Sequence, residues 1–147
     1  MRMLAIDLGT RRIGLALGDD EGKLASPLDV LTVSSPAEAF GPILNVIAKE
    51  DVRRLIVGLP LNMDDSLGPA AKSAIAWGRE LAAKAKVPLV FVDERLSSFA
   101  AEQQLIERKR MGEKLTRKRK KGQLDALAAA GFLQAYLDGQ LPEITPQ

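Results

Sequence analysis

Acidic side chains interrupt three apolar stretches of the sequence. Asp7 lies within MLAIDLGT, the pair Asp93-Glu94 follows VPLVFV, and Asp125 lies near the start of QLDALAAAGFLQAYL. Carboxylates that are crowded together are costly to ionise unless a cation neutralises them. A few such acids can hold two divalent ions about 3.5–4 Å apart, which is the arrangement found in nucleases and polymerases. The acids therefore predict a metal-dependent site, provided that the fold brings them together.

Each of these acids also has a plainer interpretation. Asp7 precedes a glycine turn in DLGT, so it could serve that turn or a loop that cradles a nucleotide phosphate. Asp93, Glu94 and Arg95 could form a structural ion-pair cluster at the end of a strand. Asp125 could simply favour the dipole near a helix N-terminus. The three positions together are less easily explained in these ways than each position alone.

The composition narrows the chemistry. The chain contains no histidine and no cysteine, which excludes Ser-His-Asp triads, Cys-His pairs, disulfides and zinc-thiolate sites. Carboxylate oxygens suit Mg²⁺ or Mn²⁺ better than zinc or copper, so the expected cofactor is Mg²⁺ or Mn²⁺. A chain without cysteine is by default expected in the cytoplasm. No stretch approaches the roughly 20 apolar residues that span a bilayer, so no membrane partner is expected.

The hydrophobic pattern predicts the elements that position the acids. Three meander strands followed by alternation of strands and helices predict an α/β fold, with a mixed five-stranded sheet and helices on both faces. A single domain is expected over residues 1–147, with a short tail at 139–147. The predicted elements are strands at 3–8, 12–18 and 24–33, a helix at 35–49, a strand at 54–58, a helix ending near 86, a strand at 87–92, and helices at 97–108 and 123–137.

The order of the elements indicates where the acids meet. Ligand sites in open α/β sheets form beyond the carboxyl ends of parallel strands. If the first and last strands are parallel and close together, Asp7 and Glu94 face one region. The final helix can bring Asp125 to the same place. Ser97 and Ser98 are interpreted as helix caps, because no base is present to make either a nucleophile.

A strongly basic segment precedes the final helix. Nine of the 21 Lys and Arg residues fall between Arg108 and Lys121, with only Glu113 opposing them. This segment is predicted to be a mobile loop at about 109–122, with Gly112 and Gly122 at its breaks. Its charge indicates a polyanionic partner, and 4% aromatic content favours recognition of backbone and shape over base stacking. The predicted nucleic-acid contacts are Arg110, Lys114, Arg117, Lys118, Arg119, Lys120 and Lys121.

Four stretches carry a family resemblance: IDLGTRRIGLALGD, VGLPLNMDDS, VDERLSS and KKGQLDALAAAGFLQAYL. In order and spacing they resemble the YqgF-type family of Holliday-junction-resolvase-like nucleases, which is implicated in maturation of the 16S ribosomal RNA precursor. The resemblance spans nearly the whole chain and implies an RNase H-like fold. It also implies that Asp7, Glu94 and Asp125 are the metal-binding catalytic acids, with Asp93 as a reserve ligand.

Other residues in the matched stretches are candidates for substrate contacts. Arg12 and Arg95 lie near two of the acids, and each could clamp a phosphate or orient its neighbouring acid through a salt bridge. Asn62 could touch the nucleic-acid backbone or form an Asx-turn. Asp65 stands where the family usually has Gly, which could change the turn or add a charge near the site.

The favoured hypothesis is a two-metal nuclease that acts on structured or precursor rRNA, with ribosomal particles as further partners. A Holliday-junction resolvase or another DNA-repair nuclease, acting on branched or single-stranded DNA, would use the same acids. The expected oligomeric state is a monomer or a weak homodimer. A non-catalytic RNA-binding assembly factor is less favoured because all three acids are present. A nucleotide-binding phosphotransferase is less favoured because 147 residues supply one lobe rather than two.

Overall fold

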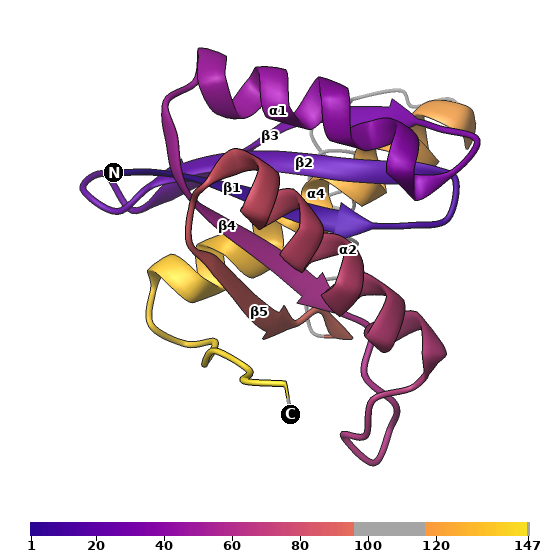
Figure 1. The fold of residues 1–147 in the computed structure, drawn as a ribbon. Coiled ribbons are helices and arrows are strands. Elements are labelled where there is room, and N and C mark those ends of the chain that lie inside the picture. The colour runs from indigo at the N-terminus through magenta and orange to yellow at the C-terminus, as the bar shows by residue number, and fades with distance from the viewer. Residues whose placement is uncertain (96–116, 147) are drawn as a thin grey trace.

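Five strands form one mixed sheet in the computed structural model, which describes residues 1–95 and 117–146 (Figure 1). They are β1 (Arg2–Leu8), β2 (Arg12–Asp19), β3 (Leu24–Thr32), β4 (Val52–Leu59) and β5 (Leu89–Asp93). The strand order is β3-β2-β1-β4-β5. β1 and β2 form an antiparallel hairpin that β3 extends, whereas β4 runs parallel to β1 and β5 runs parallel to β4. The predicted mixed five-stranded sheet is therefore confirmed.

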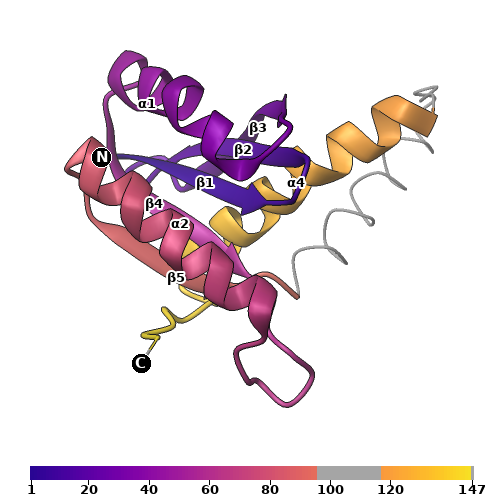
Figure 2. The same cartoon turned by 45° about the vertical axis from the view of Figure 1, so that its right-hand side comes forward.

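Helices cover both faces of this sheet, as the sequence predicts (Figures 1 and 2). A short 3₁₀ segment (Pro36–Ala39) leads into α1 (Phe40–Lys49), which packs beside α2 (Pro69–Ala85) on one face. On the opposite face α4 (Arg117–Leu137) contacts β1, β2 and β3, and its first turns project beyond the sheet in Figure 2. None of the helices that the structure describes is long and apolar enough to cross a membrane.

Alternation of side chains along β1 divides the core into two layers. Leu4 and Ile6 pack with apolar residues of α1 and α2. Met3 and Ala5 pack instead with apolar residues of α4, and all four side chains are buried. Asp7 follows Met3 and Ala5 in this alternation, so its side chain lies on the face that α4 covers. The pattern of the strand thus decides which helix can meet the acid.

Helix α4 begins earlier than the sequence predicts. Its first residue is Arg117, whereas the predicted helix begins at 123 and the predicted basic loop extends to 122. The prediction took Gly122 as the break between loop and helix. One glycine costs a helix only about 1 kcal/mol, and the neighbouring Arg and Lys residues are good helix formers. The rest of the predicted loop lies outside the described residues. So does the predicted helix at 97–108 with its caps, Ser97 and Ser98.

Pro27 and Pro36 each influence the element in which they lie. Pro27 has no backbone N–H to donate, which confines proline within sheets to edge strands and bulges. β3 does lie at the edge of the sheet, and the β2–β3 register shifts between Leu15 and Ala16. Ser35 has the extended backbone of a helix cap but makes no capping hydrogen bond through its side chain. Instead, Pro36 opens a 3₁₀ turn, which is a common start for an α-helix.

Candidate active site

The carboxyl ends of the parallel strands bring two of the predicted acids together. Asp7 is the penultimate residue of β1, and Glu94 follows the last residue of β5, with β4 between these strands. The amide of Glu94 donates to the carbonyl of Leu59 at the end of β4, with an N···O distance of 3.2 Å. A hydrogen bond joins the side chains of Asp7 and Glu94. Two strands that are not neighbours therefore contribute adjacent carboxyl groups.

Gly58 of β4 makes room for this contact. A Cβ atom at position 58 would lie 2.8 Å from Cε2 of Phe132 and 2.9 Å from Cβ of Glu94. Both distances are too short for real Cβ contacts, so a larger residue would displace one of these side chains. Gly58 is absent from the sequence-based prediction of the site. The available signal was a glycine inside an apolar strand, which often marks a close approach of another group.

Gly14 of β2 has the corresponding role on the other side of β1. It pairs directly with Asp7 in the antiparallel ladder. A Cβ atom at position 14 would lie 2.1 Å from the backbone oxygen of Asp125. Helix α4 can therefore approach the sheet at Asp125 only because position 14 has no side chain. This glycine was also missed from the sequence.

We expect Gly14→Ala to push α4 away from the sheet, because the added methyl group would meet backbone atoms that have little freedom to move. The expected loss of unfolding free energy is about 1–3 kcal/mol, the usual cost of overpacking. Gly22→Ala is the control, because a Cβ atom there would meet nothing within 4 Å. Urea unfolding of both variants measures the effect. Wild-type stability in Gly14→Ala would contradict the close approach of α4.

The pKa values of both Asp7 and Glu94 are raised above their usual values. Burial raises the pKa of Asp7; the hydrogen bond from Glu94 opposes this rise, and the charge of Asp125 adds to it. Burial and the negative charge of Asp7 raise the pKa of Glu94 to about 9. Glu94 is therefore the proton donor of the pair, and the Asp7 carboxylate is the acceptor. Two acids held in this way leave a deficit of positive charge that a cation would correct.

Asp125 lies near Asp7 and Glu94 but forms an ion pair with Arg12. Its Oδ2 atom is 3.1 Å from Nε of Arg12 at the start of β2. Burial raises the pKa of Asp125, and the charge of Arg12 opposes that rise. Within residues 1–95 and 117–146, no group of three acids is arranged to hold a metal ion. The structure thus joins Asp7 to Glu94 and places Asp125 within electrostatic reach of Asp7.

Asp93, the predicted reserve ligand, is paired with Arg95. Nε of Arg95 is 3.0 Å from both carboxylate oxygens of Asp93, and the Arg95 amide donates to Oδ1 at 3.0 Å. These hydrogen bonds hold the pKa of Asp93 below its usual value. Asp93 is therefore ionised and paired, whereas Glu94 is the member of the pair that meets Asp7. For Arg95, the geometry is that of the salt bridge rather than of an open phosphate clamp.

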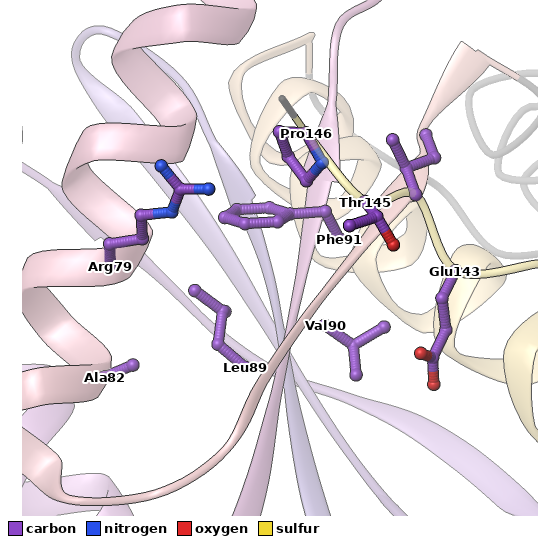
Figure 3. A pocket seen from close by; sticks show the side chains of 9 residues that line it. Arg79, Ala82, Leu89, Val90, Phe91, Glu143, Thr145 and Pro146 are labelled. Carbon is purple, nitrogen blue, oxygen red and sulfur yellow. The ribbon is translucent and has the colours of Figure 1, made fainter.

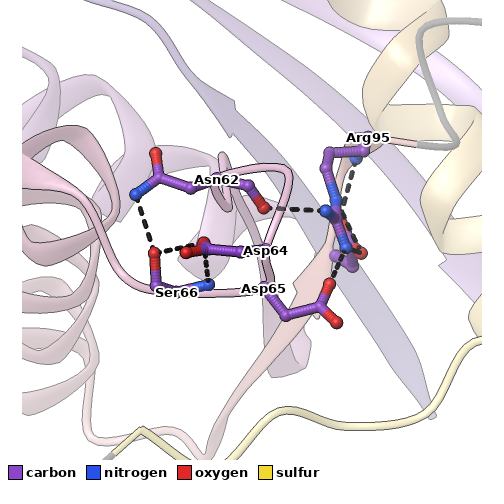
Figure 4. A network of polar contacts seen from close by, with 6 residues as sticks. Asn62, Asp64, Asp65, Ser66 and Arg95 are labelled. Atoms are coloured by element: carbon purple, nitrogen blue, oxygen red, sulfur yellow. Dashed lines mark hydrogen bonds and ion pairs between the residues drawn. The ribbon is translucent and has the colours of Figure 1, made fainter.

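The loop after β4 is closed by its own hydrogen bonds (Figure 4). Nδ2 of Asn62 donates to Oγ of Ser66 at 2.9 Å, and the Ser66 amide donates to Oδ1 of Asp64 at 3.1 Å. The backbone of Asn62 also pairs with that of Ser66 and of Asp65. Asp65 has a φ of +67°, the left-handed region that favours glycine. Asn62 thus serves the turn, and Asp65 has a backbone conformation that glycine adopts with less strain.

The basic residues are placed only in part. Arg110 and Lys114 lie outside the described residues. The five remaining predicted contacts, Arg117 to Lys121, form the first turns of α4. At 1.5 Å per residue, this stretch of helix brings the backbone from position 117 to Asp125 over about 12 Å. The chain therefore leads directly from the basic residues to the third acid.

A separate pocket lies at the edge of the sheet (Figure 3). It has a volume of about 360 Å³, and its walls include Arg79 of α2, Phe91 of β5 and Glu143 of the C-terminal segment. Ile144 also lines the pocket, and its amide donates to the Phe91 carbonyl at 2.7 Å. None of the predicted site residues lines this pocket. The Asp7–Glu94 pair lies outside this pocket, at the end of the sheet beside α4.

Comparison with solved structures defines the class of protein. The fold matches the Thermus thermophilus RuvC structure with a TM-score of 0.62, over 98% of this chain and 100% of that chain, at 20% sequence identity. It also matches the fowlpox virus resolvase in complex with Holliday junction DNA, with a TM-score of 0.55, over 95% of this chain and 98% of that chain, at 8% identity. These likenesses confirm the RNase H-like fold.

Comparison of sequences places the chain more closely. A family model named RuvX, described as Holliday junction resolvase, matches residues 1–139, and the chain belongs to this family. A relative from Anaeromyxobacter sp. (strain Fw109-5) is 43% identical over 95% of this chain and 98% of its own. One from Opitutus terrae is 42% identical over 99% of this chain and 97% of its own. Both carry the name "Putative pre-16S rRNA nuclease". The resemblance to the YqgF-type family is thereby confirmed.

Proposed function

We propose that this protein is a divalent-metal-dependent nuclease that hydrolyses phosphodiester bonds during processing of the 16S ribosomal RNA precursor. Relatives that carry a pre-16S rRNA nuclease name match nearly the whole chain, which supports the substrate. The observation that carries the proposal is the hydrogen-bonded pair of carboxyl groups, Asp7 and Glu94, on the face that also holds Asp125. We place the protein in the cytoplasm, in contact with ribosomal particles, as a monomer or a weak homodimer.

The donor groups fit Mg²⁺ or Mn²⁺. Asp7, Glu94 and Asp125 offer only carboxylate oxygens, which these ions prefer. The retained proton of the Asp7–Glu94 pair marks a place where positive charge is missing. We propose that these three acids hold two ions. When bound, such a pair of ions supplies the positive charge that activates an attacking water and stabilises the leaving oxygen.

Two changes within the chain accompany this function. Glu94 gives up its proton, so that both members of the pair are carboxylates. If Asp125 held a metal ion in place of its ion pair with Arg12, the Arg12 guanidinium would be available to clamp a substrate phosphate with two N–H donors. The basic residues at the start of α4 bind neighbouring phosphates, which gives an affinity that is independent of sequence and sensitive to salt.

Replacing Arg12 by Gln should weaken substrate binding more than it slows the chemical step. The variant loses one phosphate contact, so KM should rise, and the slope of log K against log salt should fall by about 0.7–0.9. Arg2→Gln is a matched control, because Arg2 is half-exposed and paired with Glu50 at the opposite end of β1. Binding titrations at several salt concentrations measure both variants. An unchanged salt slope in Arg12→Gln would leave Arg12 with only the role of orienting Asp125.

Resolution of DNA junctions is the second candidate function. The matching family model is described as Holliday junction resolvase, and the same acids would serve this reaction. Thermus thermophilus RuvC in complex with a Holliday junction substrate matches with a TM-score of 0.60 at 19% identity, which is evidence for the fold alone. Junction resolution usually needs two coordinated cuts and therefore a two-fold dimer. A stable dimer in solution would favour this candidate over RNA processing.

A side-by-side cleavage assay tests the proposed function. The substrates are a 16S precursor RNA, single-stranded DNA and a four-way DNA junction, each with Mg²⁺, Mn²⁺ or a chelator. We expect the precursor RNA to be cut fastest, and only with metal present. Paired cuts in the junction at a higher rate would support a resolvase instead. Absence of cutting in every reaction would contradict both nuclease functions and would favour an RNA-binding assembly factor.

A further inference from the structure

Arg95, the residue after Glu94, is the centre of a network of hydrogen bonds and ion pairs (Figure 4). Its Nε atom binds both carboxylate oxygens of Asp93 at 3.0 Å, and its Nη1 donates to the Asn62 carbonyl at 2.8 Å. Its Nη2 is 2.5 Å from Oδ1 of Asp65 and 2.6 Å from Oδ2 of Asp93. Glu94 lies between Asp93 and Arg95 in sequence. The network therefore fixes the residues on either side of the proposed ligand.

Asp65 contributes the link between two different segments. Asp93 is only two residues from Arg95, so their ion pair constrains the chain locally. Asp65 belongs to the loop after β4 and is 30 residues from Arg95. The contacts of Arg95 with Asp65 and with the Asn62 carbonyl tie that loop to the segment after β5. They reinforce the hydrogen bond from the Glu94 amide to the end of β4.

The backbone at position 65 gives independent support. With a φ of +67°, Asp65 occupies a region where Gly is less strained. The backbone conformation of the turn therefore does not itself favour a carboxylate at this position. The ion pair with Arg95 supplies a compensating interaction.

We propose that Asp65, by holding Arg95, is a positioning residue for Glu94. Arg95 then acts as an orienting group rather than as a phosphate clamp, because its Nε, Nη1 and Nη2 atoms all donate to partners within the protein. The consequence for metal binding rests on the proposed function. The positioning itself concerns the metal-free protein and can be measured without substrate or metal.

Amide hydrogen exchange of Glu94 in the metal-free protein tests the positioning. Asp65→Asn removes the charge but keeps a residue that tolerates the left-handed backbone. Asp65→Gly removes the carboxylate and relaxes the turn. We expect exchange at Glu94 to be about tenfold or more faster in both variants. We also expect the Kd for Mn²⁺, measured by calorimetry, to rise about 10-fold or more, as is common when a group that orients a metal ligand is lost.

Asp51→Asn is the matched control. Asp51 also has a positive φ, of +52°, and its carboxylate is 3.1 Å from Nε of Arg53. Its side chain is 79% exposed, against 77% for Asp65. This second ion pair lies at the start of β4, at the opposite end of the strand from Glu94. Exchange at Glu94 and Mn²⁺ affinity should therefore match the wild type in Asp51→Asn.

The outcomes separate this inference from the proposed function. Wild-type exchange at Glu94 in both Asp65 variants would overturn the positioning role, whatever the wild type does with Mn²⁺. Weakened binding of nucleic acid in chelator, without faster exchange, would also overturn it and would make Asp65 and Arg95 substrate contacts. Faster exchange in a protein whose wild type binds no Mn²⁺ would keep the positioning role, while the proposed metal-dependent function would fail.

Discussion

Asp7→Asn should lower the rate of metal-dependent cleavage by at least about 10³-fold, as is typical when a group central to a catalytic unit is removed. Asn keeps the shape of the side chain but has no charge and only one oxygen acceptor. Asp7 is the acceptor in the pair with Glu94 and lies within electrostatic reach of Asp125. Its neutralisation therefore affects the whole group of acids. Single-turnover cleavage of the preferred substrate in Mg²⁺ measures the loss.

The control for this variant is Asp29→Asn, which neutralises an exposed acid on the edge strand β3. It should cleave at the wild-type rate. Near-ultraviolet circular dichroism of both variants checks that the fold is unchanged. Cleavage by Asp7→Asn at the wild-type rate would mean that the activity comes from another residue or from a contaminating nuclease.

Glu94→Gln should stabilise the metal-free protein at neutral and alkaline pH. The pKa of Glu94 is raised from 4.5 to about 9 in the folded protein, first by burial and then by the charge of Asp7. The folded state therefore holds a proton that the unfolded chain releases, so the contribution of Glu94 to stability is complete below about pH 4.5 and is lost as the pH rises through 9. Gln cannot ionise and can still donate a hydrogen bond to Asp7.

The expected gain in unfolding free energy is on the order of 3 kcal/mol at pH 7 in chelator, and it should grow up to about pH 9. With saturating Mn²⁺ the order should reverse, because only the wild type keeps the full set of ligands. Fluorescence of Trp77, the single and buried tryptophan, can follow the unfolding. Glu80→Gln, at an exposed position of α2, is the control. A wild type more stable than Glu94→Gln in chelator at every pH would contradict the raised pKa of Glu94.

Much of the fold could be predicted because its determinants are local. Apolar alternation gives the meander strands, and Pro27 marks the edge strand through its missing N–H. The approach of Glu94 to Asp7 could be anticipated because the carboxyl ends of parallel strands meet at one edge of a sheet. The predicted start of α4 was wrong because Gly122 is only a weak helix breaker within a run of good helix formers.

Other features of the site could not be predicted because they depend on packing between distant segments. The choice between Asp93 and Glu94 is made by Arg95, whose third partner, Asp65, comes from another loop. The need for Gly14 and Gly58 becomes visible only when α4 and the segment after β5 are in place. The ion pair of Arg12 with Asp125 likewise joins a strand to a helix that lies far along the chain.

Titration of Mn²⁺ into the metal-free protein at pH 7 tests the central claim most directly, because it measures the site without any assumption about substrate. Calorimetry in two buffers of different ionisation enthalpy would report both binding and proton release. We expect the wild type to bind Mn²⁺ and to release about one proton, the one that Glu94 holds, whereas Asp7→Asn should show no binding. Absence of binding by the wild type, or undiminished binding by Asp7→Asn, would contradict the assignment of these acids as a metal site.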